Sequence, residues 1–184
     1  DAYSSSKAAA ETLVRASNTA LCVLRLAAVM PTILILNSMI KMVKLMYDMP
    51  LAARCEIVLD EDVAFALVSA AENLVGSGEM RGRTGFIAGG RQNGLQISID
   101  AMLKGSLNPL GIELPAARLF SDDLNAYYLD WYDTDALQSI LHYQNHTYDQ
   151  WQAMTKRAYR YLKPLVTLLR PFVQKWLERQ SPRY

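Results

Sequence analysis

The sequence has few cysteines, almost no net charge and no long apolar run, and each absence excludes a class of protein. Cys22 and Cys55 are too few for a disulfide scaffold and fit no CxxC metal site, so we expect a reducing, cytoplasmic location. Nineteen Lys and Arg against eighteen Asp and Glu give +1, which excludes charge-driven disorder and disfavours nucleic acid as a partner. The longest uncharged apolar run, residues 26–40, is interrupted by Pro31 and is shorter than the about 18–20 residues of a membrane span.

A glycine-rich phosphate-binding turn is also missing. The glycines of residues 76–90 do not form the G-x-x-G-x-x-G pattern that follows the first strand of dinucleotide-binding folds. No signal-peptide pattern precedes Asp1, and the first residues already have the composition of a helix interior. We therefore expect a C-terminal portion of a longer protein, with a length of 184 residues that fits one domain or a large piece of one.

Apolar runs and helix-forming segments alternate through residue 104, which predicts an α/β fold, and the rest of the chain is expected to be mostly helical. The run at 21–29 is nearly continuous and apolar, as in parallel strands buried on both faces. The other expected elements are helices over 3–18, 33–47 (rich in Met), 60–74 and 96–103, strands over 56–59 and 84–88, and a glycine-rich loop over 76–85.

Charge is distributed unevenly over the last third of the chain. Residues 119–150 contain six Asp, no Lys or Arg and five of the ten Tyr, whereas residues 151–184 contain eight Lys and Arg and one acid, Glu178. The basic tail alternates cations with apolar residues, so it either packs on the acidic segment or lies on an anionic membrane surface. Because Pro164 and Pro171 interrupt the tail, we favour packing on the acidic segment.

Tyr3 and Lys7 are four positions apart in a predicted helix, so their side chains share one face. A free tyrosine is a poor base at neutral pH, but a neighbouring ammonium group favours its phenolate form. Such a pair can act as a proton shuttle. The Y-x-x-x-K pattern also arises by chance on exposed helices, so the spacing alone leaves both interpretations open.

Four matches, the first of which combines two segments, carry a family resemblance, and they occur in family order. A-Y-S-S-S-K-A-A-A-E at 2–11 is followed by the strand V-L-R-L-A-A-V-M-P at 23–31, then by V-L-D-E-D-V-A-F-A at 58–66 and F-I-A-G-G at 86–90. The late segment Y-Y-L-D-W-Y-D-T-D-A-L-Q-S-I-L-H-Y-Q at 127–144 is similar to D-x-x-K/R-x-x-x-x-L-G-Y/W-x-P. Together they resemble the extended short-chain dehydrogenase/reductase family, of the NAD-dependent epimerase/dehydratase type.

The resemblance implies a full-length NAD- or NADP-dependent epimerase, dehydratase or reductase acting on a hydroxyl or keto group. Tyr3 would be the catalytic acid/base, and Lys7 would lower the pKa of Tyr3 and bind the nicotinamide ribose. Ala28, Val29 and Pro31 would face the nicotinamide carboxamide. The catalytic Ser or Thr and the glycine-rich turn would lie upstream, so the chain alone would be inactive.

The implied fold is α/β: the C-terminal part of a doubly wound Rossmann-like sheet plus a smaller, mostly helical substrate-binding lobe. Residues 1–30 would end the dinucleotide-binding domain, and residues 31–160 would form the lobe, with 56–90 returning to the sheet. Residues 161–184 would be a basic helical tail. The helix 4–18, rich in small residues, would pair with its counterpart in a homodimer.

The substrate is expected to be a small molecule, either a nucleotide sugar or a more apolar hydroxy or keto compound. Residues 28–30 lack the Asn common in nucleotide-sugar members, and Arg54 lies eight positions before Asp62 where such members often have Arg seven before. Two rival functions are a non-catalytic dinucleotide-binding or regulatory relative, and a membrane-surface protein acting through its basic tail.

The remaining candidate sites are assigned to structure, and no metal site is expected. The consecutive acids of residues 60–62 could ligate a metal but suit the first turn of a helix, where carboxylates favour the helix dipole. His142, His146 and Asp149 have a spacing compatible with zinc but lack a convincing further ligand. Cys22 and Cys55 are interpreted as packing residues.

Overall fold

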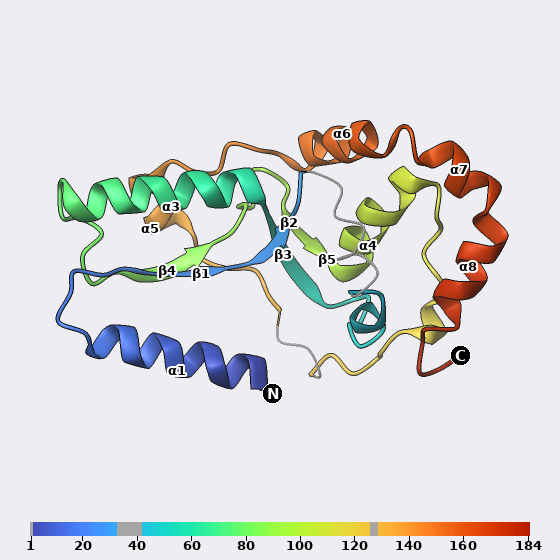
Figure 1. Ribbon diagram of the computed structural model, residues 1–184, viewed down its shortest axis with the longest axis horizontal. Coiled ribbons are helices and arrows are strands. Elements are labelled where there is room, and N and C mark those ends of the chain that lie inside the picture. Colours follow the sequence, from blue (N-terminus) through green and yellow to red (C-terminus); the bar gives the residue numbers. More distant parts are fainter. Residues whose placement is uncertain (1, 33–41, 126–128) are drawn as a thin grey trace.

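The computed structural model describes residues 2–32, 42–125 and 129–184, and its architecture is α/β, as predicted (Figure 1). The strands are β1 (Val23–Leu26), β2 (Ala28–Met30), β3 (Arg54–Leu59), β4 (Thr84–Ile87) and β5 (Gln96–Ser98). The helices are α1 (Ala2–Ala16), α3 (Asp60–Val75), α4 (Ile99–Leu107), α5 (Asp135–Leu141), α6 (Tyr148–Tyr159), α7 (Lys163–Leu168) and α8 (Arg170–Glu178), with short 3₁₀ turns η1 (Asn108–Leu110) and η2 (Ala117–Leu119).

The strands form two small sheets. β1 pairs in parallel with β4, with Val23 opposite Thr84, and β2 pairs in parallel with β3, with Ala28 opposite Ile57. β5 then pairs antiparallel with β3. The carboxyl ends of β2 and β3 therefore lie at the same edge of their sheet, which is where ligands bind in open α/β sheets. The finer assignment to a doubly wound sheet with a separate lobe remains a prediction.

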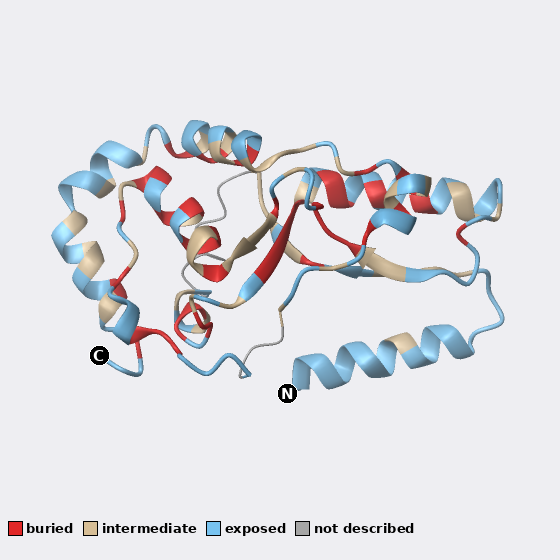
Figure 2. Ribbon diagram, turned by 180° about the vertical axis from the view of Figure 1, so that it is seen from behind, coloured by how far each residue is buried: buried red, intermediate tan, exposed pale blue. Residues whose placement is uncertain are grey.

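The apolar run at 21–29 is not the strand buried on both faces that its composition predicts. It is divided at Ala27 into β1 and β2, which pair with different partners. Arg25 and Leu26 are exposed, and Val29 is 39% exposed. The physical reason is that α1, the helix beside β1, has no buried residue and does not seal that face (Figure 2).

The helix expected over 96–103 begins later than predicted. Residues 96–98 form β5, and Ser98 caps the following helix by accepting a hydrogen bond from the Ala101 amide at 3.2 Å. Pairing with β3 decides the conformation of this short segment, because tertiary contacts override its local preference for helix. The other expected elements occur close to their predicted bounds. Of the helix predicted over 33–47, residues 33–41 lie outside the described residues, and 42–46 are helical.

Buried side chains gather in two clusters on either side of β2 and β3. One lies between α3, α5 and the β1–β4 pair and includes Val63, Ala66, Ile87 and Tyr143. The larger one is enclosed by α4, α6 and α8; its members include Tyr47, Ile57, Leu59, Ile99, Leu103, Trp151 and Leu177. Among the described residues, no helix has the length and apolar character needed to cross a bilayer.

Candidate functional site

The predicted catalytic pair lies on an exposed helix. Tyr3 and Lys7 are both in α1, and the Lys7 ammonium is 5.5 Å from the centroid of the Tyr3 ring, in cation–π geometry. Tyr3 is 70% exposed, so the phenol is accessible to a ligand. The structure thus brings the two predicted catalytic residues together on one face.

Glu11 continues the same face of α1 and holds it against the sheet. It follows Lys7 by four positions, so it stands one turn further along the stripe that begins with Tyr3. Arg25 of β1 donates to the Glu11 carboxylate at 2.9 Å, and Arg15 donates to it at 2.8 Å. These hydrogen bonds, first that of Arg25, lower the pKa of the Glu11 carboxyl.

Arg15 adds a second connection between α1 and the β1–β4 pair. Its guanidinium donates to the Thr84 hydroxyl at 2.6 Å while also binding Glu11. The orientation of α1 is therefore set by polar contacts and not by buried apolar side chains. Sequence reasoning missed Glu11, although its regular spacing after Tyr3 and Lys7 was a usable signal.

The Glu11–Arg25 contact places the phenol level with the end of the strand. α1 runs antiparallel to β1, so its first turn lies toward the carboxyl end of the strand (Figure 1). Eight helical residues from Glu11 back to Tyr3 span about 12 Å. Three or four strand residues from Arg25 on to Ala28 and Val29 span about 10–13 Å.

The predicted cofactor contacts Ala28 and Val29 are in β2, and Pro31 follows that strand directly. Ala28 is partly buried against the larger core, whereas Val29 is exposed. No hydrogen bond or ion pair of the described residues joins Tyr3 or Lys7 to these three positions. Ala28, Val29 and Pro31 thus lie at the strand end toward which the first turn of α1 is directed, without a direct polar connection to Tyr3 or Lys7.

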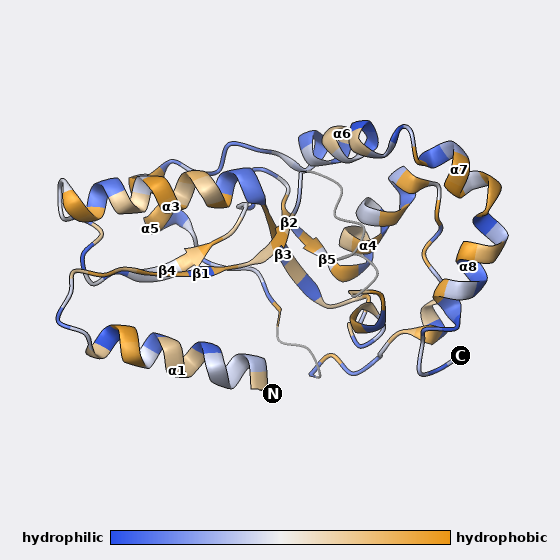
Figure 3. Ribbon diagram, in the orientation of Figure 1, coloured by the Kyte–Doolittle hydropathy of each residue, from blue (hydrophilic) through white to orange (hydrophobic). Residues whose placement is uncertain are grey.

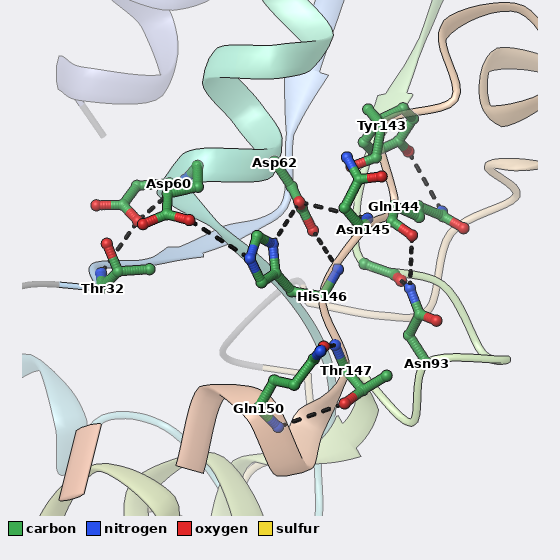
Figure 4. Close-up of polar contacts among 12 residues, drawn as sticks. Thr32, Asp60, Asp62, Asn93, Tyr143, Gln144, Asn145, His146, Thr147 and Gln150 are labelled. Carbon is green, nitrogen blue, oxygen red and sulfur yellow. Dashed lines mark hydrogen bonds and ion pairs between the residues drawn. The ribbon is translucent and has the colours of Figure 1, made fainter. Parts of the chain in front are cut away.

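The backbone after Pro31 is held by the first turn of α3. The Thr32 amide donates to Asp60 Oδ1 at 3.0 Å, and the Glu61 amide donates to the same oxygen (Figure 4). The acids of 60–62 lie in the first turn of α3, as predicted, and no side chain caps this helix through a hydrogen bond. Asp60 instead joins the ends of β2 and β3.

Asp62 is a buried carboxylate that binds His146. The side chain is 1% exposed, and its Oδ1 lies 2.6 Å from His146 Nδ1. The amides of Asn145 and His146 also donate to Asp62, each at 3.3 Å (Figure 4). On the other side of the ring, His146 Nε2 is 3.4 Å from Glu61 Oε2. No local sequence pattern predicts this pair, because its members are 84 positions apart.

A second buried carboxylate, Glu56, binds three N–H donors in the middle of β3. It is fully buried and accepts from the Gly90 amide at 2.9 Å, Gln96 Nε2 at 3.1 Å and the Tyr132 amide at 2.7 Å. These three donors come from three separate segments. Such a carboxylate, with its lone pairs used by N–H groups, is a structural element and not a free base.

A cleft of about 370 Å³ opens beside Thr32 at the end of β2. Its other lining residues include Glu61 from α3 and Arg157, Arg160 and Tyr161 from α6 and the turn after it. The cleft adjoins the edge where Pro31 lies, so it is a candidate substrate site. Its wall combines acidic and basic side chains with the apolar Met154 and Ala158, so it can contact both polar and apolar groups of a substrate.

The described residues contain no cluster of three or more His, Cys, Asp or Glu side chains placed to hold a metal ion. His142 and His146 are not on one helix, because His142 ends α5 and α6 begins at Tyr148. Their four-residue spacing therefore does not create a shared face. Cys55 is buried, which raises the pKa of its thiol to about 12 and makes it unreactive at neutral pH.

No protein-family model matches the chain, and no curated protein matches it significantly.

Proposed function

We propose that this chain supplies the proton-transfer residues and the substrate-binding part of an NAD- or NADP-dependent epimerase, dehydratase or reductase. Tyr3 is the acid/base, and Lys7 stabilises negative charge on its oxygen. The observation that most supports this proposal is the Glu11–Arg25 contact. It aligns α1 with β1 so that Tyr3 is expected at the same height as Ala28 and Val29. A catalytic phenol has to reach the atoms that the cofactor and substrate present at that edge.

Local conformation gives independent support to the resemblance on which the proposal rests. His142 occupies the position of Gly in the family pattern L-G-Y/W, and its φ of 49° lies in the left-handed region that favours glycine. Gly89 follows β4 by two residues, and a Cβ added there would be 2.5 Å from the Ile57 carbonyl oxygen. At both positions the backbone has the geometry that the glycines of the family pattern would require.

The residues present fit only one end of the proposed cofactor. Ala28 is small and lies where the resemblance puts the nicotinamide, but the described residues include no glycine-rich turn for a pyrophosphate. When bound, the cofactor supplies hydride transfer. Tyr3 gives a proton to, or takes one from, the substrate oxygen, and the cleft beside Thr32 holds the rest of the substrate. A homodimer through 4–18 stays a prediction.

The test compares variants of the protein that contains this chain and its dinucleotide-binding segment. Tyr3→Phe should lower turnover by about 10²–10⁴-fold, with cofactor affinity nearly unchanged, because only proton transfer is lost. Lys7→Ala should weaken both. Nicotinamide absorbance measures turnover, and calorimetry measures cofactor affinity.

Two further variants separate positioning from chemistry. Glu11→Gln should lower kcat and also weaken cofactor affinity, because it removes the charge that orients α1, which carries both Tyr3 and Lys7. Glu79→Gln, in the exposed loop after α3, is the matched control and should change neither. Equal cofactor affinities in the Tyr3 and Lys7 variants, or full turnover without the Tyr3 hydroxyl, would contradict the proposal.

A further inference from the structure

We propose that α7 and α8 form a docking surface for an anionic lipid membrane, a property independent of the proposed enzyme activity. The surface is named here the outer stripe. It consists of large, exposed apolar side chains of the two helices and of the residue between them: Leu165, Leu168, Leu169, Phe172 and Trp176.

The outer stripe is not part of the protein core. Leu165 and Leu168 are three positions apart in α7, and Phe172 and Trp176 are four positions apart in α8, so each pair shares one face of its helix. Leu168 is 77% and Phe172 76% exposed. In Figure 3 both helices carry strongly apolar segments, and Figure 2 shows most of the same ribbon as exposed. Contiguous exposed apolar groups of this size indicate an interaction surface.

A different set of residues on the same helices anchors them to the domain. Leu162, Val166 and Val173 pack against the larger core, and Leu177 is buried in it. The Tyr47 hydroxyl also donates to the Leu177 carbonyl at 2.6 Å. Because these contacts hold the helices in place, the outer stripe is presented on a fixed support.

Charge selects the kind of partner. Lys163, Lys175 and Arg179 are exposed in or directly after the same helices, while Glu178 is the one acid in residues 151–184. Lys and Arg can lay their alkyl stems on an apolar surface and keep their charges at the headgroups. Leu, Phe and Trp beside cations are the composition of helices that lie in the plane of an anionic membrane.

The prolines that argue from sequence against an amphipathic helix do not interrupt one. Pro164 and Pro171 are each the second residue of a helix, where the missing amide proton would have no helical partner. The predicted packing of the tail on the acidic segment is limited: Ser181 donates to the Leu119 carbonyl at 2.7 Å, and Arg170 pairs with Glu113, outside that segment. The outer stripe is left available.

The experiment is flotation of the 184-residue chain with phosphatidylcholine vesicles that contain or lack phosphatidylserine. We expect flotation with the anionic vesicles, weakened by high salt. Leu168→Glu with Phe172→Glu should lower the bound fraction roughly tenfold or more, because two large apolar groups leave the interface. Lys175→Glu with Arg179→Glu should remove the preference for phosphatidylserine.

Val75→Glu is the matched control, since Val75 is 80% exposed at the end of α3, on the opposite side of the molecule (Figure 1). Its flotation should equal that of the original chain. Circular dichroism and urea midpoints establish that each variant is folded. No flotation, equal flotation with neutral vesicles, or unchanged flotation of the Leu168/Phe172 variant would overturn the proposal. So would a dimer in sedimentation that Phe172→Glu dissociates, with no vesicle binding, because a second copy would then cover the stripe.

Discussion

Replacing Asp62 by Asn tests whether the buried carboxylate holds the segment before α6 to the start of α3. Asp62 accepts hydrogen bonds from the Asn145 amide, the His146 amide and His146 Nδ1. Asparagine has almost the same shape, but one of its terminal groups is a donor. In the variant, that amide group faces a backbone N–H, or it meets His146 Nδ1 and requires the ring proton to move to Nε2.

The expected cost follows from those three contacts. Hydrogen bonds to a charged group contribute about 1.5–3 kcal/mol each, and a buried donor left without a partner costs about 1–3 kcal/mol. The 2.6 Å contact with His146 is the shortest of the three, whereas the two amide contacts at 3.3 Å are long. We therefore count one strong bond and one displaced donor, which gives a loss of about 2–4 kcal/mol in the free energy of unfolding.

Urea unfolding monitored by circular dichroism measures this loss, with Glu79→Gln as the exposed control. His146→Ala and the double variant complete a cycle, whose coupling energy should be about 1–3 kcal/mol because the two side chains touch. A loss below about 1 kcal/mol for Asp62→Asn, or additive effects in the cycle, would refute the reasoning.

Three further predictions concern other parts of the chain. Burial raises the pKa of Tyr47 to about 12, so the folded state favours the neutral phenol; its stabilisation is complete below pH about 10 and is lost as the pH rises toward 12. Tyr47→Phe should flatten that alkaline loss of unfolding free energy, measured from pH 9 to 12 in urea. Gly89→Ala should cost about 2 kcal/mol or more by the same assay, because its Cβ would meet the Ile57 carbonyl, whereas Gly85→Ala meets only a flexible leucine side chain and should cost less. In the full-length protein, Ala9→Arg should shift a dimer toward monomer in light scattering; an unchanged dimer would place the interface elsewhere.

Elements with strong local signals were predictable from the sequence. The acids of 60–62 followed by a periodic apolar segment predicted α3, and alanine-rich residues 8–10 predicted α1. β4 was predictable because an apolar run lies between glycine-containing loops. In each case neighbouring residues determine the conformation, so no distant contact had to be known.

The features that the sequence did not predict depend on contacts between residues far apart in the chain. β5 forms because Gln96–Ser98 meets β3 across more than forty residues, although its composition also suits the first turn of a helix. One face of β1 is half-exposed because of the way α1 is attached, and no local sequence pattern predicts that attachment. The Asp62–His146 contact likewise joins segments that only the fold brings together. Within the candidate site, the sequence identified the residue pair on α1 but not the contacts that orient it.

The way α1 is attached has a consequence for the proposed chemistry. A helix bound by buried apolar side chains would be fixed by its packing, and a change in one charge would matter little. α1 has no buried residue, and Glu11 and Arg15 make its polar contacts with Arg25 and Thr84. Exposed ion pairs contribute little stability, so α1 is held only weakly and mainly by charge. The alignment of Tyr3 with the strand end is therefore an electrostatic property, and it should weaken with salt or acid before the core unfolds.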